Sequence, residues 1–286
     1  MSALIAPFSE QPRAHRGVLF GTPAHALWLR VLRFGGVLGT LLFTAYAIDY
    51  LDIDLDRLAG MLGRIGVVLA TRYYPPNIDH VLAPDYLHSV LETLQMSYAA
   101  TVLGLLCAVP LAWCASSNLT PDRRFLQPLA RFIIIAARSV HEMIWTILLV
   151  SLIGFGMLPG TIALMFFCIG FSGKLFTEAL ESISPGPVDA TRATGARKLQ
   201  VLFVAAWPQV QVAWTGIAIY TWDAVFRAAT VVGFFGAGGM GWYLRESTQL
   251  IASRDVAAIL LSIILVVAIS EIASAWLRHR IAHAVA

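Results

Sequence analysis

The chain has 286 residues, of which 58% are hydrophobic and only 13% are charged, whereas soluble domains are about half apolar and about a quarter charged. Its mean hydropathy of +0.73 and its long apolar runs exclude an ordinary soluble domain and indicate a polytopic membrane protein built from helices rather than barrel strands. The net charge of +3 is too small to indicate a nucleic-acid partner.

The chain begins with a polar stretch over residues 1–26, which we expect to be a cytoplasmic tail. The apolar run over 27–48 predicts a first transmembrane helix, and the arginines at its entrance place its N-terminal end inside the cell. Residues 49–87 differ, because leucines recur there at helical spacing after a cluster of aspartates. This pattern predicts an amphipathic helix on the periplasmic surface.

Residues 88–280 alternate apolar runs with short polar loops, which predicts further membrane spans. We expect these spans over residues 88–116, 128–153, 161–183, 200–222 and 255–277. Residues 223–254 are rich in glycine. Arginine and lysine are concentrated in the segments that this order places in the cytoplasm, so both termini are expected inside. The expected fold class is an all-α polytopic membrane protein with about six transmembrane helices.

A polar, turn-rich stretch interrupts the apolar runs over residues 178–208. Pro185-Gly186-Pro187 breaks the preceding span, since proline lacks an amide donor and glycine adopts dihedral angles that strain other residues. Asp189 is a good N-cap for a short helix, and Gly195 is typical of a helix end. We therefore expect residues 184–199 to form a short cytoplasmic helix, joined stiffly to both neighbouring spans, which another protein can push.

The same stretch resembles the cytoplasmic loop of ABC importer permeases, whose pattern is E-A-A-x-x-x-G-x(9)-I-x-L-P. Asp189-Ala190-Thr191 stands in the first three places, and Gly195 and Pro208 match the glycine and the proline in spacing. The acid is Asp instead of Glu, and Ala205 and Trp207 replace Ile and Leu. An ordinary loop between two spans is the alternative. The resemblance implies a coupling helix that docks on an ATP-hydrolysing subunit through Asp189, Ala190, Thr191, Arg192, Ala193, Gly195, Ala196, Arg197 and Pro208.

Six further stretches carry a more specific resemblance. They are Tyr73-Tyr74-Pro75-Pro76, Arg138-Ser139-Val140-His141-Glu142-Met143, Ser184-Pro185-Gly186-Pro187-Val188, Arg192-Ala193-Thr194-Gly195-Ala196, Ala229-Thr230-Val231-Val232-Gly233 and Gly236-Ala237-Gly238-Gly239-Met240-Gly241. Together they resemble one branch of that family, the phosphonate-type permeases, which includes permeases for phosphite and hypophosphite. The resemblance implies the fold of a type I importer with a MetI-like transmembrane domain in the bacterial inner membrane. It also implies a homodimer of this subunit, two ATP-binding subunits and a periplasmic substrate-binding protein, with ATP and Mg on the partner and no cofactor in this chain.

Charged side chains inside predicted spans are costly unless they are paired or functional. Opposite charges recur four residues apart, and each such pair can neutralise itself on one helix face. The pairs are Arg138 with Glu142, Lys174 with Glu178, and Asp223 with Arg227. The expected third span also places Arg138, His141, Glu142 and Trp145 on one face.

The functional interpretation of these charges is a weak, transient path for a small oxyanion, because the planar guanidinium group offers two parallel donors to phosphoryl oxygens. The expected path residues are Arg138, His141, Glu142, Lys174, Arg227 and Thr230. Glycines permit close approach and unusual dihedral angles, and a bent segment at an outer gate is expected at Gly233, Gly236, Gly238, Gly239 and Gly241.

The sequence contains no P-loop, so ATP hydrolysis is expected on another chain. The seven histidines and three cysteines form no tight ligand cluster, and we expect neither a metal site nor a catalytic residue. Two other functions stay open. One is a permease for methionine or a metal chelate, for which the path arginines would be surplus. The other is an intramembrane lipid-modifying enzyme, for which Glu92, Glu142 and Glu178 would have to come together. The motifs do not separate phosphonate, phosphite and hypophosphite.

Overall fold

The computed structural model describes residues 23–51 and 55–285, and the chain divides into two units, residues 1–66 and 67–286. In the first unit, α1 (Pro23–Tyr50) covers the apolar run of the expected first span, and no side chain of its membrane-spanning window is buried in the protein. The expected tail lies largely outside the described residues. α2 (Leu55–Val68) occupies the segment for which an amphipathic helix is expected.

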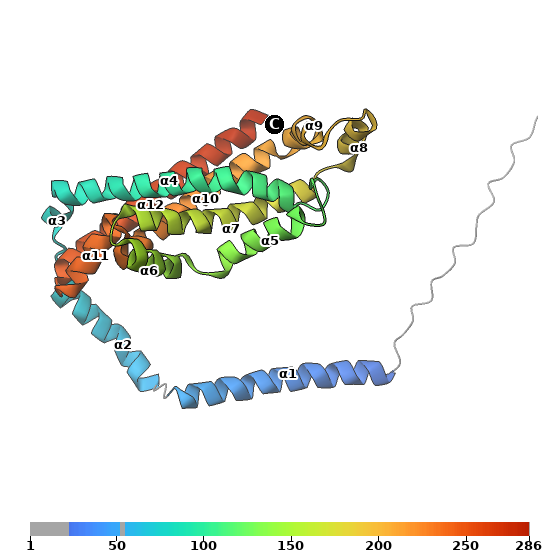
Figure 1. The fold of residues 1–286 in the computed structure, drawn as a ribbon. Coiled ribbons are helices and arrows are strands. Elements are labelled where there is room, and N and C mark those ends of the chain that lie inside the picture. The colour runs from blue at the N-terminus through green and yellow to red at the C-terminus, as the bar shows by residue number, and fades with distance from the viewer. Residues whose placement is uncertain (1–22, 52–54, 286) are drawn as a thin grey trace, which may run out of the picture. The chain divides into compact units, whose positions relative to one another are not determined.

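The second unit is a bundle of helices (Figure 1). Its centre is the pair α4 (Pro84–Ala115) and α7 (Met157–Glu181), where small residues allow close packing. Gly104 lies so near α7 that a Cβ added to it would stand 2.5 Å from the Cβ of Cys168. The remaining helices are α3 (Ile78–Leu82), α5 (Leu126–Ser139), α6 (Glu142–Ile153), α8 (Pro185–Ala193), α9 (Lys198–Val201), α10 (Trp207–Val232), α11 (Gly239–Gln249) and α12 (Ser253–Val285).

The expected third span is not one helix, and this prediction was wrong. α5 and α6 meet at an angle of 86°. Val140 and His141 are extended between them, and the Nδ1 atom of His141 accepts a hydrogen bond from the amide of Met143, which caps α6. Glu142 follows in the first turn of α6, where a carboxylate is favourable. Polar residues that end one helix and start the next thus replace a continuous apolar helix.

The bent pair nevertheless crosses the bundle. At one end, Arg131 of α5 forms an ion pair with Glu181, which lies just before residues 184–199, here named the coupling segment. At the other end, the amide of Gly156 after α6 donates to the carbonyl of Gly236. The pair is therefore one broken span. With it, the described residues contain six candidate spans, and the other five are unbroken helices of sufficient length and apolarity.

Other boundaries differ from the expected ones. The fifth span continues from the π-helical turn Leu202–Ala206 through α10 to Val232, so residues 223–232 are helical and the irregular segment begins only at Gly233. The second span starts earlier, at Pro84, because proline is favourable in the first helical turn. The last helix starts at Ser253 and extends beyond residue 277.

We expect Gly170→Ala to destabilise the broken span. Gly170 of α7 packs against the end of α5, and an added Cβ would lie 2.8 Å from the amide nitrogen of Arg138. Because backbone cannot move aside as a flexible side chain can, the overpacking should lower the free energy of unfolding by about 1–3 kcal/mol. Thermal unfolding of the purified complex measures this loss. Gly216→Ala is the matched control, because a Cβ there meets nothing within 4 Å. Equal melting temperatures for the two variants would contradict the prediction.

Candidate functional site

The coupling segment forms the short helix that the sequence predicts, with a different start. α8 begins at Pro185 after Ser184, so Asp189 lies inside the helix and its expected N-cap role was wrong. The cause is Pro185, whose fixed φ favours the first helical position. The end is as predicted. Gly195 has a φ of +79°, and its amide donates to the carbonyl of Arg192, in the left-handed conformation that favours glycine.

The segment is packed firmly onto the bundle. Val188 of α8 is buried with Leu119 and Val201 in one apolar cluster that also includes residues of α4, α7 and α10. Trp207, which stands at the leucine place of the motif, meets Trp214 at a centroid distance of 5.7 Å, and Trp214 stacks on Phe176 at 4.5 Å. Trp207 is 42% exposed, whereas Trp214 and Phe176 are buried. The segment is therefore packed directly against α7 and α10 through the buried cluster.

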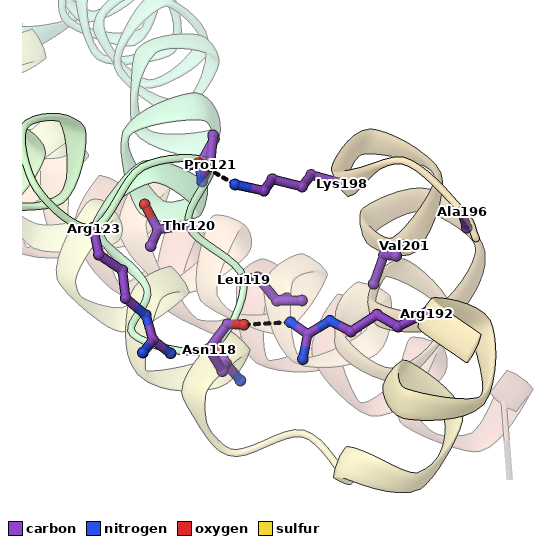
Figure 2. Close-up of a pocket in the computed structure, with 9 residues that line it drawn as sticks. All are labelled: Asn118, Leu119, Thr120, Pro121, Arg123, Arg192, Ala196, Lys198 and Val201. Atoms are coloured by element: carbon purple, nitrogen blue, oxygen red, sulfur yellow. Dashed lines mark hydrogen bonds between the residues drawn. The ribbon is translucent and has the colours of Figure 1, made fainter. Parts of the chain in front are cut away.

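Two cations also tie the segment to the loop between α4 and α5 (Figure 2). The Nη2 atom of Arg192 donates to the carbonyl of Asn118 at 2.7 Å, and the Nζ atom of Lys198 donates to the carbonyl of Pro121. Between the two bridges lies a cavity of about 450 Å³, which Arg123 also lines. The sequence analysis missed these bridges, since backbone acceptors in a distant loop leave no residue pattern.

Most of the expected docking residues are exposed on the surface of the coupling segment. Within the expected docking set, Thr191 and Ala196 are half-buried, whereas the other side chains and glycines are exposed. Pro208 differs from the rest because it belongs to the first turn of α10. The exposed members are Asp189, Ala190, Arg192, Ala193, Gly195, Arg197 and Pro208.

A second feature is a basic cavity of about 250 Å³ between α5 and α7. Arg131, Arg138, Lys174 and Glu181 line it. Arg131 is paired with Glu181 at 2.8 Å, and Lys174 is paired with Glu178 at 3.0 Å. Arg138 is exposed and forms no ion pair or side-chain hydrogen bond with any residue that the structure describes. The cavity therefore presents an unneutralised guanidinium group to an entering anion.

The structure separates the other expected path residues. Glu142 cannot pair with Arg138 along one helix, because the chain turns between them, and its carboxylate lies 3.4 Å from His141 Nδ1 instead. The shared face expected for these residues was wrong for the same reason. Arg227 on α10 pairs with the buried Asp223 at 2.6 Å, as the spacing predicts. Thr230 donates back to the carbonyl of Arg227.

The glycine-rich segment is bent, as the sequence predicts, and is held by α4. The helix breaks at Gly236, which has a φ of +108°. α11 then begins against α4, where Glu92 accepts from the amide of Gly239 at 3.2 Å and Thr93 accepts from the amide of Met240 at 2.9 Å. The glycines are tightly packed, since a Cβ added to Gly233 or Gly241 would meet backbone, and one added to Gly236 or Gly239 would meet the side chain of Phe155 or Thr93. This double cap was not predicted from the sequence, although Glu92, a carboxylate near the end of an expected span, indicates that a polar partner lies near it.

We expect Thr93→Val to loosen α11. Thr93 is fully buried, and valine keeps its shape but removes the acceptor for the amide of Met240. An unsatisfied buried amide costs about 1–3 kcal/mol. Hydrogen exchange of the complex should show faster exchange at residues 239–242. Thr101→Val is the control, because the hydroxyl of buried Thr101 only donates within its own helix, to Ser97. Unchanged exchange in the Thr93 variant would contradict the prediction.

Comparison with known families decides the class of protein. A family model described as "Binding-protein-dependent transport system inner membrane component" matches residues 100–283, which include the broken span, the coupling segment and α11. The chain belongs to this family. It is therefore a permease component of an importer and a multi-pass protein of the inner membrane.

Relatives and solved structures agree with this membership. The permease is 36% identical over 251 residues to the phosphite transport system permease protein PtxC of Stutzerimonas stutzeri, which covers 88% of this chain and 89% of the relative. It is 33% identical over 254 residues to the phosphate-import permease protein PhnE of Mycolicibacterium smegmatis, covering 88% of this chain and 47% of the relative. The inward-facing MetNI methionine ABC transporter has a TM-score of 0.60 at 19% identity, over 68% of this chain and 95% of that one. This likeness concerns the fold alone.

Proposed function

We propose that this permease imports a phosphorus oxyanion such as phosphite or a phosphonate. The observation that carries the proposal is the 36% identity to a phosphite permease, which extends over most of both chains. The basic cavity supports it, because Arg138 offers an unpaired planar fork that suits phosphoryl oxygens. Methionine has no net charge, so it would gain less than an oxyanion from the positive field of the cavity.

The cavity is suited to passage rather than storage of the anion. Arg131 and Glu181 line it near the coupling segment, whereas Arg138 and Lys174 lie about 10 Å further along their helices. The two flanking cations are already paired with glutamates. Arg138 is therefore the one strong donor that an oxyanion meets, and the positive field of the cavity attracts the anion. Several unpaired charged donors would instead hold the anion too tightly for passage.

In this proposal the exposed face of α8 and the following turn docks on an ATP-binding subunit, which holds ATP and Mg. Two copies of the permease, two ATP-binding subunits and a periplasmic binding protein complete the importer. The coupling segment and both termini are cytoplasmic. The excess of basic residues on that side supports this orientation. For the C-terminus, Figure 1 also supports it, since α12 ends at the same end of the bundle as α8 and α9. Movement of the segment switches the bundle between two states.

The proposal is tested with the complex reconstituted in vesicles together with its binding protein. ATP hydrolysis is measured with phosphite, methylphosphonate, hypophosphite, sulfate or methionine added outside. We expect stimulation by one or more of the phosphorus anions, and none by sulfate or methionine. Stimulation by methionine alone would overturn the proposed substrate class, and hydrolysis by the permease without partners would overturn its assignment as a purely coupled subunit.

A further inference from the structure

The end of the bundle opposite the coupling segment carries a second group of cations. Arg72 and Arg254 line a cavity of about 430 Å³ together with Asp255 and the turn over residues 251–253. Asp255 accepts a hydrogen bond from Asn77 at 2.7 Å. Neither arginine forms an ion pair or side-chain hydrogen bond with a residue in the described part of the chain. Two guanidinium groups and one carboxylate line the cavity, so its net charge is positive.

A separate apolar groove of about 420 Å³ lies further along α12, between α12, α3 and α4. Arg254 shares one face of α12 with Ala258, Leu261 and Leu265, because these residues recur at helical spacing. The latter three line the groove. The rise from Arg254 to Leu265 is about 16 Å, close to half of the roughly 30 Å hydrocarbon core of a bilayer. The positive cavity thus suits a lipid headgroup, and the rise from Arg254 to the groove residue Leu265 matches the hydrocarbon thickness of one leaflet.

The surroundings of the cavity indicate the level of the membrane interface. Ile251 is 77% exposed and Leu250 is 72% exposed at the turn before α12. Ile251 has a φ of +54°, which is an unfavourable conformation for a β-branched side chain. The turn thus holds an apolar side chain outward at some cost. Tyr74, two residues after Arg72, is 69% exposed, and tyrosine is enriched at the bilayer interface.

We propose that this end of the permease binds one anionic phospholipid. Its phosphate lies between Arg72 and Arg254, and one acyl chain lies in the groove along the exposed side chains of Leu261 and Leu265. A free phosphorus oxyanion would account for the two arginines but would leave the groove unused. A zwitterionic lipid would fill the groove but would gain less from the unpaired cations.

The test uses the purified complex with its ATP-binding subunits, delipidated in a neutral detergent. Binding of phosphatidylglycerol and phosphatidylcholine of equal chain length is measured by native mass spectrometry during titration. We expect phosphatidylglycerol to bind preferentially. In the double variant Arg72→Gln/Arg254→Gln its apparent affinity should fall roughly thirtyfold, since each arginine near an anionic lipid contributes about a factor of five. Addition of phosphite in millimolar excess should displace no lipid.

Two further variants keep the test decisive. Arg245→Gln removes a cation that lies over Phe155 and Trp242, outside this cavity, and should leave lipid binding unchanged. Arg72→Lys/Arg254→Lys keeps both charges and should retain most of the affinity, which also shows that the site survives substitution. Equal binding of the two lipids would overturn the proposal, as would unchanged affinity in the glutamine variant or displacement of the lipid by phosphite.

Discussion

Replacement of Arg138 by alanine is expected to abolish uptake while the assembled complex still hydrolyses ATP. Arg138 is exposed to the basic cavity and has no anionic partner among the described residues, so its removal leaves no buried charge unpaired. A charged hydrogen bond is worth about 1.5–3 kcal/mol, and loss of a two-donor contact should lower uptake about a hundredfold. The docking face of α8 is unchanged, so hydrolysis by the ATP-binding subunits continues.

Uptake of labelled phosphite into vesicles and release of inorganic phosphate from ATP are measured on the same preparation. Arg138→Lys keeps the charge but loses the planar fork, and intermediate uptake is expected. Arg124→Ala is the matched control, because Arg124 is an exposed arginine just before α5 that does not line the cavity. Normal uptake by Arg138→Ala would remove Arg138 from the proposed path and make it a structural residue.

The second large effect is expected from Ala193→Asp, which should prevent stable association with the ATP-binding subunit. Ala193 is the last residue of α8 and is exposed. A carboxylate there introduces a desolvated charge into the docked interface and also stands at the negative end of the helix dipole. We expect at least a tenfold loss of co-purified ATP-binding subunit and a matching loss of uptake. A proline at this position should have the same result by breaking the last turn of α8.

Two controls separate docking from folding. Ala193→Ser keeps a small side chain and should leave co-purification intact. Thr248→Asp places a new carboxylate on the exposed end of α11, far from the coupling segment, and should also leave co-purification intact. If Ala193→Asp retains the ATP-binding subunit at the level of the unaltered chain, the docking face does not include the end of α8.

The broken span shows that hydropathy can predict a membrane span without predicting whether it is one continuous helix. Residues 128–153 are apolar enough on average for one membrane-spanning helix. Their mean hydropathy does not reveal that the polar residues Ser139, His141 and Glu142 lie close together in the middle. In the structure these residues end α5 and start α6, and the last turn of α5 packs against Gly170 of α7. Irregular backbone at this depth is tolerated only where protein or water satisfies its polar groups. The position of the break therefore depends on α7, and Arg138 lines one cavity with Lys174 instead of pairing with Glu142.

The sequence by itself determined the class of the fold and the place of the coupling segment. Long apolar runs must become helices in a bilayer, and Pro185 and Gly195 restrict their own backbone, so these features are local and survive in any packing. The tertiary structure alone decided the 86° break, the cap of α11 by Glu92 and Thr93, and the bond from Arg192 to a carbonyl 74 residues away. The break depends on the packing of the end of α5 against Gly170 of α7. The cap and the bond depend on backbone groups brought near by packing, and backbone groups are the same at every position of the sequence.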